Sequence, residues 1–120
     1  MLETAVYAAL VANATVNRKC NTRIYPIVMP QGVKFPAITY QRISGGKVNT
    51  LDGYSGLANP HMVINSWATN YDTAKELSKD IHVTMNAATF KTILATELDA
   101  YDSDLGLFAV SQDFSVWGEE

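Results

Sequence analysis

Two glycine-containing segments carry residue types that could do chemistry, and the first has the composition of a phosphate-binding loop. Residues 44–48 read Ser-Gly-Gly-Lys-Val. In a P-loop, backbone N–H groups and a lysine hold the phosphates, and a Ser or Thr hydroxyl binds magnesium. Here Val48 stands in place of that hydroxyl, and Gln41 stands in place of the first glycine. We therefore interpret the segment as a turn.

The second segment, Gly53 to Leu57, has the serine and the glycines of a nucleophile elbow but not their spacing. An elbow needs its second glycine two residues after the serine, where the chain turns sharply from strand to helix. Leu57 occupies that place. We therefore interpret Ser55 as a loop serine.

Acidic residues and histidines could in principle bind a metal, but their spacing is wrong. Residues 102–104 (Asp-Ser-Asp), with Asp113 further on, have Leu107 where a calcium loop requires its central glycine. Turn carboxylates explain these residues more simply. His61 and His82 fall on different expected elements, without the spacing of paired ligands. We expect no catalytic residue, no cofactor and no metal site.

The charge balance argues against a nucleic-acid-binding protein, and the single cysteine excludes an internal disulfide. The chain has 12 acidic and 9 basic residues, and the basic ones are scattered, whereas a dedicated nucleic-acid-binding protein needs them clustered. Cys20 is the only cysteine, so neither an internal disulfide nor a structural cysteine-based metal site can form. We interpret Cys20 as a loop residue in a protein made in a reducing cytoplasm. The length of 120 residues is typical of a single domain, residues 1–120.

Residues 6–14 are apolar, but they do not have the flanks of a signal peptide. No Lys or Arg precedes Arg18, whereas a signal peptide begins with a basic region. No apolar run reaches the length of about 20 residues that a membrane span requires. We therefore expect neither secretion nor a membrane partner.

Hydrophobic periodicity predicts two helices. Residues 2–13 place apolar side chains three and four apart, and the polar run at residues 17–22 is expected to end this helix. The second helix follows Asn70, a favourable N-cap, and Asp72 in its first turn suits the helix dipole. The expected buried stripes are Leu2, Val6 and Leu10 in the first helix and Ala74, Leu77, Ile81 and Met85 in the second.

Alternating apolar and polar residues predict strands in the first half of the chain. Residues 23–28 form a short one, which Pro26 places at a sheet edge because proline cannot donate to a ladder. Pro36 opens the next strand, and residues 61–67 alternate strictly. Both faces of this last strand are partly apolar, so both could be covered.

The segment between these strands, residues 44–59, is rich in Gly, Ser, Asn, Asp and Thr and is expected to be a long loop. It carries Leu51, Tyr54 and Leu57. Apolar residues on a long exposed loop are explained best by a partner that they contact. In the alternative, these three side chains fold back onto their own domain.

Six short segments occur in order along the chain: Arg23–Pro26, Pro30–Gly32, Tyr40–Ser44, Leu51–Leu57, the alternating run that ends in Trp67-Ala68, and Phe114–Trp117. Together they resemble the tail-completion family (tail-terminator or tail-to-head joining proteins) of long-tailed bacteriophages and related gene-transfer particles. None of the segments encodes a reaction, and the resemblance covers almost the whole chain. The chain departs from the family at Asn65-Ser66, where many relatives carry an acidic residue, and in its short tail after Trp117.

The resemblance resolves an ambiguity in the second half of the chain. By propensity alone, residues 90–98 fit a strand or a helix, and the family implies a strand. An acidic turn at residues 99–104 and a long last strand, residues 105–117, complete a hairpin. We therefore expect an α+β fold, with a mainly antiparallel sheet of four to five strands and two helices packed on one face.

The family also implies a function. Its members form a ring, usually hexameric, at the head-proximal end of a finished tail tube, where the ring stops tube growth and docks to the head–tail connector, or stopper. DNA passes through the lumen without specific binding. The resemblance thus implies a structural protein of the virion tail or neck, assembled in the host cytoplasm, and not an enzyme.

We expect the contacts with partners to come from the long loop and the C-terminal tail, because loop tips and termini reach neighbours that a sheet cannot. The candidate interface residues are Lys47, Leu51, Asp52, Tyr54, Leu57, Trp117, Glu119 and Glu120. One alternative is another neck component, a stopper or adaptor, that contacts the portal side. A second alternative is a small enzyme or ligand-binding domain with the same layout.

Overall fold

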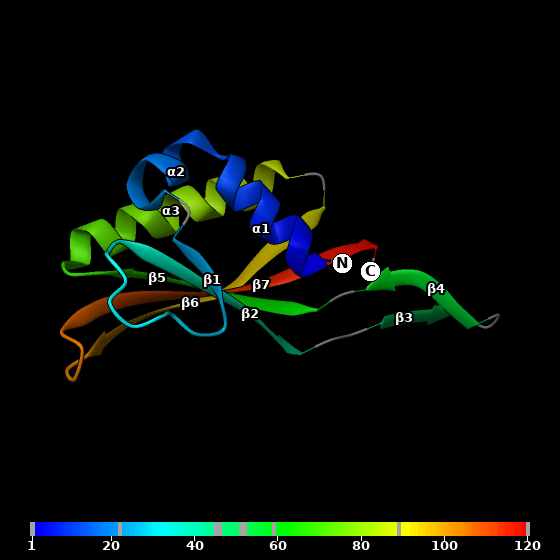
Figure 1. Cartoon of the computed structure of the whole chain (residues 1–120). Helices are drawn as coiled ribbons and strands as arrows, with labels where there is room; N and C mark the ends of the chain where they lie inside the picture. The colour runs from blue at the N-terminus through cyan, green and yellow to red at the C-terminus, as the bar shows by residue number, and fades with distance from the viewer. Residues whose placement is uncertain are drawn as a thin grey trace.

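The computed structural model describes residues 2–21, 23–44, 47–50, 53–58, 60–88 and 90–119, and it has two parts (Figure 1). In the body, helices cover one face of a sheet. The arm, defined as strands β3 (Lys47–Thr50) and β4 (Gly53–Ala58), extends away from the body. The molecule measures 51 × 28 × 23 Å along its principal axes, so it is elongated. None of the described helices is long and apolar enough to cross a membrane.

The body sheet has five strands in the order β1-β2-β5-β7-β6. Every neighbouring pair is antiparallel except β1 and β2, which run parallel. The strands are β1 (Ile24–Pro26), β2 (Ala37–Ser44), β5 (His61–Ala68), β6 (Lys91–Asp102) and β7 (Leu107–Glu119). The edge position of β1 and the strand predicted at residues 90–98 are both confirmed.

Three helices, α1 (Leu2–Ala12), α2 (Ala14–Cys20) and α3 (Tyr71–Ala87), lie on the same face of this sheet (Figure 1). α3 begins as predicted, because the Asn70 side chain accepts a hydrogen bond of 2.8 Å from the backbone N–H of Thr73. The expected stripe residues Val6, Leu10, Ala74, Leu77, Ile81 and Met85 are all buried, and most join Met62, Ile64 and Phe114 in the core. The side chain of Leu2 lies outside the described part. The α+β class is confirmed.

α2 corrects the sequence prediction, in which the polar run at residues 17–22 ends the first helix without starting another. The Asn13 side chain accepts hydrogen bonds from the backbone N–H groups of Thr15 and Val16, at 3.0 and 3.1 Å. Asn13 therefore caps a new helix immediately after α1. In the run, Arg18 and Asn21 are exposed, while Val16 and Cys20 lie in the core.

Cys20 is a buried helix residue, not the loop residue that the sequence predicts. It closes α2, where its Sγ donates to the Val16 carbonyl at 3.3 Å. Burial raises the pKa of its thiol to about 11. Lys19 next to it forms an ion pair with Asp80 of α3, which fastens α2 to the longer helix.

The acidic turn is also shorter than predicted. β6 continues to Asp102, which pairs with Leu107 of β7, and residues 103–106 make the turn, with Gly106 at a φ of 68°. The Asp102 Oδ1 accepts hydrogen bonds from the backbone N–H groups of Asp104 and Leu105, at 3.0 and 3.2 Å. The interpretation of Asp102 as a turn carboxylate is therefore confirmed.

Candidate assembly surface

The arm replaces the long loop predicted at residues 44–59. β3 and β4 pair antiparallel, with Lys47 opposite Ala58, so the backbone groups of a Gly- and Asn-rich segment satisfy one another. Ser55 lies in β4 and is a strand residue, which corrects its interpretation as a loop serine. The glycines between β2 and β3, predicted to form a turn, lie outside the described residues.

The arm joins the body through the end of β7. Leu57 pairs with Glu119 and Ala58 pairs with Gly118, so one long strand serves both parts of the molecule. Just inside this junction, the Val116 N–H donates to the Pro60 carbonyl at 3.0 Å. Among the described ranges, the two β4–β7 pairs are the ladder that connects arm and body. The arm is therefore a two-stranded projection that is joined to the larger body at the end of β7.

The structure places most of the described candidate interface residues near the root of this arm, whereas Tyr54, which pairs with Asn49, lies toward its far end. Trp117 lies opposite Lys91 in the β6–β7 ladder and is 42% exposed. Lys47, Tyr54 and Leu57 lie in the strands of the arm and Glu119 lies in β7, whereas Leu51, Asp52 and Glu120 lie outside the described residues. The two separate segments named from the sequence thus meet in space, at the pairing of Leu57 with Glu119.

A groove of about 750 Å³ lies beside the arm root, on the side of β6. Its lining is Asn86, Ala88, Phe90, Lys91, Thr92, Ile93 and Trp117. Ile93 is 64% exposed. The groove therefore presents the exposed side chains of Ile93 and Trp117 next to the amine of Lys91. Uncovered apolar surface with a polar rim is typical of a contact with another protein.

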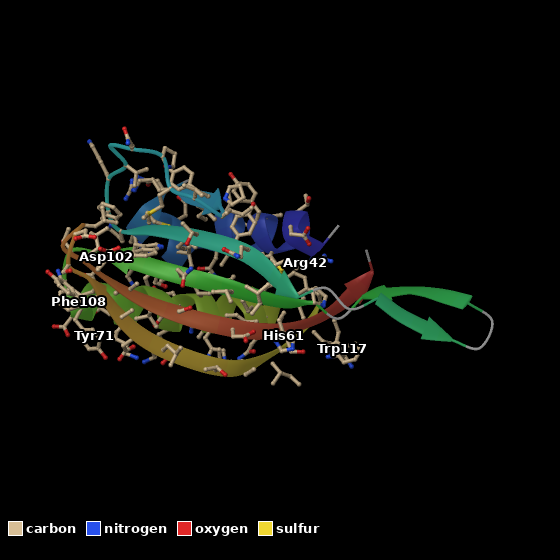
Figure 2. The ribbon with its side chains drawn as sticks, turned by 90° about the horizontal axis from the view of Figure 1, so that it is seen from below. Arg42, His61, Tyr71, Asp102, Phe108 and Trp117 are labelled. Atoms are coloured by element: carbon tan, nitrogen blue, oxygen red, sulfur yellow. The ribbon has the colours of Figure 1, made fainter. Side chains whose placement is uncertain are left out.

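The sheet face opposite the helices is partly uncovered near the arm. His61 of β5 and Asp113 of β7 lie on this face, and His61 Nδ1 is 2.9 Å from Asp113 Oδ1. Figure 2 shows His61 and Trp117 at the arm end of the body. The strict alternation of residues 61–67 correctly places His61 on the side opposite Met62. The sequence did not predict its partner, because cross-strand register is not visible in spacing.

The comparisons with known proteins agree with this geometry. The model of the family described as tail completion protein gp17 matches residues 4–119, almost the whole chain. The chain belongs to the tail completion protein gp17 family. Among solved structures, it is similar to a chain of the "Virion of native gene transfer agent (GTA) particle", with a TM-score of 0.80 and 16% identity over 99% of this chain and 95% of that chain. That likeness shows the shared fold. No curated protein matches the chain.

As a member of this family, the protein is a structural protein of the virion tail. Some of its charged residues away from the arm have structural partners. The Tyr71 hydroxyl donates to Asp99 at 2.6 Å, and Lys75 Nζ lies 2.9 Å from Asp99 and 3.2 Å from Glu97. The hydrogen bond from Tyr71 lowers the pKa of Asp99, and the bond to Asp99 raises the pKa of Lys75, so both stay charged at neutral pH. These contacts tie α3 to β6.

In this tail completion protein, no group of three or more His, Cys, Asp or Glu residues that could hold a metal occurs within the described ranges. His61 contacts Asp113, and His82 of α3 packs against Phe114, with 6.1 Å between the ring centroids.

Proposed function

We propose that this protein forms a hexameric ring at the head-proximal end of the tail tube. There it terminates tube growth and joins the tail to the head–tail connector. The family match over residues 4–119 carries the proposal, because this family is named for completing tails. The working unit of the ring would be one tail-terminator-like domain, residues 1–120.

The arm supports a role in assembly. A two-stranded hairpin is marginally stable on its own in water, and here two residue pairs attach it to the body. Contact with another protein would stabilise it. A closed ring needs two different surfaces of each copy to meet, and an arm that projects from a compact body supplies one of them. The contact residues that we propose are Lys47, Leu51, Asp52, Tyr54, Leu57, Trp117, Glu119 and Glu120.

The charge of the chain suits passage of DNA without binding. Its formal net charge is −3, so the ring as a whole would carry the same sign as the phosphate backbone. We place the protein in the neck of the virion, assembled in the host cytoplasm, with tail tube protein on one side and stopper on the other.

The test is to mix the purified protein with tail tubes assembled in its absence and to view the tube ends by negative-stain electron microscopy. A ring on one end, and tubes that then join filled heads, is the expected result. Tubes treated with buffer alone are the control. Tube ends without rings would contradict the proposal.

The alternative is another neck component, a stopper or adaptor on the portal side. The same family match favours a neck location for both, and the binding preference separates them. Protein that ignores tubes but binds isolated heads would support the alternative.

A further inference from the structure

The two edges of the body sheet carry opposite charge. Figure 2 shows the loop after β1, in cyan, along one side of the sheet and β6 along the opposite side. Residues 4–51, which include α2, β1 and β2, contain six of the nine basic residues and no acidic residue. Residues 90–120, which include β6, contain seven acidic residues and one lysine. The basic residues are spaced too widely to form a phosphate-binding patch, but they give the two edges different signs.

The β1 side keeps a net positive charge after its ion pairs are counted. Two of its cations, Lys19 and Arg42, have acidic partners. Arg18 of α2 and Lys34 of the loop between β1 and β2 are exposed. The Arg23 guanidinium donates to two backbone carbonyls, which carry no formal charge. This side can therefore attract a surface rich in carboxylates.

The β6 side stays net negative. Lys75 of α3 contacts both Glu97 and Asp99, so one amine faces two carboxylates. Asp104 is exposed in the turn that follows β6. The β6 edge of one copy would therefore repel the β6 edge of another copy and attract its β1 edge.

Each edge also exposes apolar side chains. Beside β1, Ile27 and Val28 are 66% and 70% exposed, and Leu98 of β6 is 63% exposed. Ile27 has a φ of 65°, which is rare for a β-branched residue, and the Val28 N–H donates to the Pro26 carbonyl at 2.6 Å. This tight turn is strained, and it holds two apolar side chains in solvent. Strain of this kind is typical of positions that have a function.

A groove of about 500 Å³ lies next to the strained turn and is lined in part by Tyr7, Pro26, Ile27 and Tyr40. The ladder registers relate this groove to the opposite edge. The Ile27 N–H donates to the Tyr40 carbonyl, and Tyr40 lies in one row across the sheet with Ile64, Gln112 and Glu97. Leu98 follows Glu97 directly. Copies that stand side by side with their strands aligned would therefore bring the turn and its groove to Leu98 of the neighbour.

We propose that the β1 edge of each copy binds the β6 edge of the next copy around the ring, with Ile27 and Val28 against Leu98 and with cations against carboxylates around them. This inference rests on the proposed function, and it names the body surfaces that ring neighbours share. A ring contact joins two different surfaces of identical copies, and these two edges are different and complementary. An apolar centre with a charged rim is the usual composition of such a contact.

The first test is cross-linking of full-length Val28→Cys/Leu98→Cys protein with a short bismaleimide, both free and with tail tubes. A contact between different surfaces is expected to give a ladder of covalent oligomers that ends at the size of the ring. Either single variant should stay at background, and a mixture of the two single variants should stop at dimers. The native Cys20 is buried and present in every sample, so it sets that background.

The outcomes separate this inference from the proposed function. Wild-type rings on tube ends without a ladder from the double variant would overturn the edge contact and leave the function standing. A ladder in solution with bare tube ends would support the edge contact and overturn the function. Single variants that cross-link as fast as the double variant would mean that one edge meets itself, which overturns the inference. Neither rings nor a ladder would overturn both.

The second test uses the sign of the charge, measured as the protein concentration at which half of the tube ends carry rings. Val28→Asp should raise this concentration about tenfold more than Val28→Lys, because the facing edge is acidic. At Leu98 the order should reverse, with Lys more harmful than Asp. Val83→Asp is the control, because Val83 is 61% exposed on α3. The same sign preference at both positions, or none at either, overturns the proposal.

Discussion

The body and the arm are both built from paired strands, and the buried core residues among the described side chains lie in the body. In the body, alternate side chains of β5 are fully buried beneath the helices, and Phe114 of β7 lies among them. The arm has two strands and is joined to the body by two ladder pairs. The body is therefore expected to fold without partners, whereas the arm is expected to gain order from what it contacts. We therefore expect the stability of the fold to depend on the body and its assembly with partners to depend on the arm.

The largest effect is expected in the body core. Phe114→Ala removes a fully buried ring and should lower the free energy of unfolding by about 3–5 kcal/mol, because a cavity remains where the ring was. Urea unfolding followed by circular dichroism measures it. Val83→Ala, at an exposed position, is the control and should change little. Equal effects of the two variants would mean that the body has no specific core.

A smaller loss is expected at the start of α3. Asn70→Ala removes the acceptor of the Thr73 N–H and should cost about 1 kcal/mol of stability. Asn86→Ala, near the other end of the same helix, is the control, and it should lower the free energy of unfolding less than Asn70→Ala does. A larger loss at Asn86 than at Asn70 would contradict the capping role. The same unfolding measurement applies.

Cys20 makes a contribution that depends on pH. The thiol has a pKa of about 11 in the folded protein, against an ordinary value of 9.0, so the folded state favours the protonated form. Its contribution is present below pH 9 and is lost as pH rises toward 11, because the unfolded chain ionises first. Unfolding of Cys20→Ala should depend less on pH in that window. Fast labelling of native Cys20 by a thiol reagent at pH 8 would contradict the burial.

The smallest effect on stability is expected in the arm. Deletion of residues 50–57 should change the free energy of unfolding by less than about 0.5 kcal/mol, because the body core is untouched. The same deletion should abolish joining of tails to heads, measured as assembled particles. Normal assembly by the deletion variant would remove the arm from the proposed interface. A large loss of stability would show that body and arm fold together.

Much of the body follows from local patterns in the sequence. The α3 stripe at Leu77, Ile81 and Met85 and the alternation of β5 each predict one buried face, and the structure has both. A helix or strand that covers a core must repeat its apolar residues with its own period. The pattern is strongest where burial is strongest, so the core elements are the predictable ones.

The errors lie where tertiary contacts override local signals. The seven residues of α2 are too few to show a period, although Asn13 and the spacing of Val16 and Cys20 are signals that could have predicted it. Asp99 looks like a turn residue, but its contacts with Tyr71 and Lys75 hold it in β6. The arm lacks a clear period, and its strand formers Val48, Thr50 and Tyr54 are interspersed with Gly and Asn, which favour turns. Of the candidate interface, the sequence predicted the two segments but not their meeting at the arm root.

Gln112 has a consequence for how the sheet can be aligned. It lies on the buried face of β7 between Val110 and Phe114, and its Nε2 donates to the Ser78 carbonyl of α3 at 3.0 Å. Sliding β7 by one residue would expose Phe114, so the apolar pattern alone rejects that error. A slide of two residues would keep every apolar side chain inside, but it would carry the amide away from its carbonyl, at a cost of about 1–3 kcal/mol. A single buried amide thus selects the native register of β7 over the register shifted by two residues, which the apolar pattern alone would allow.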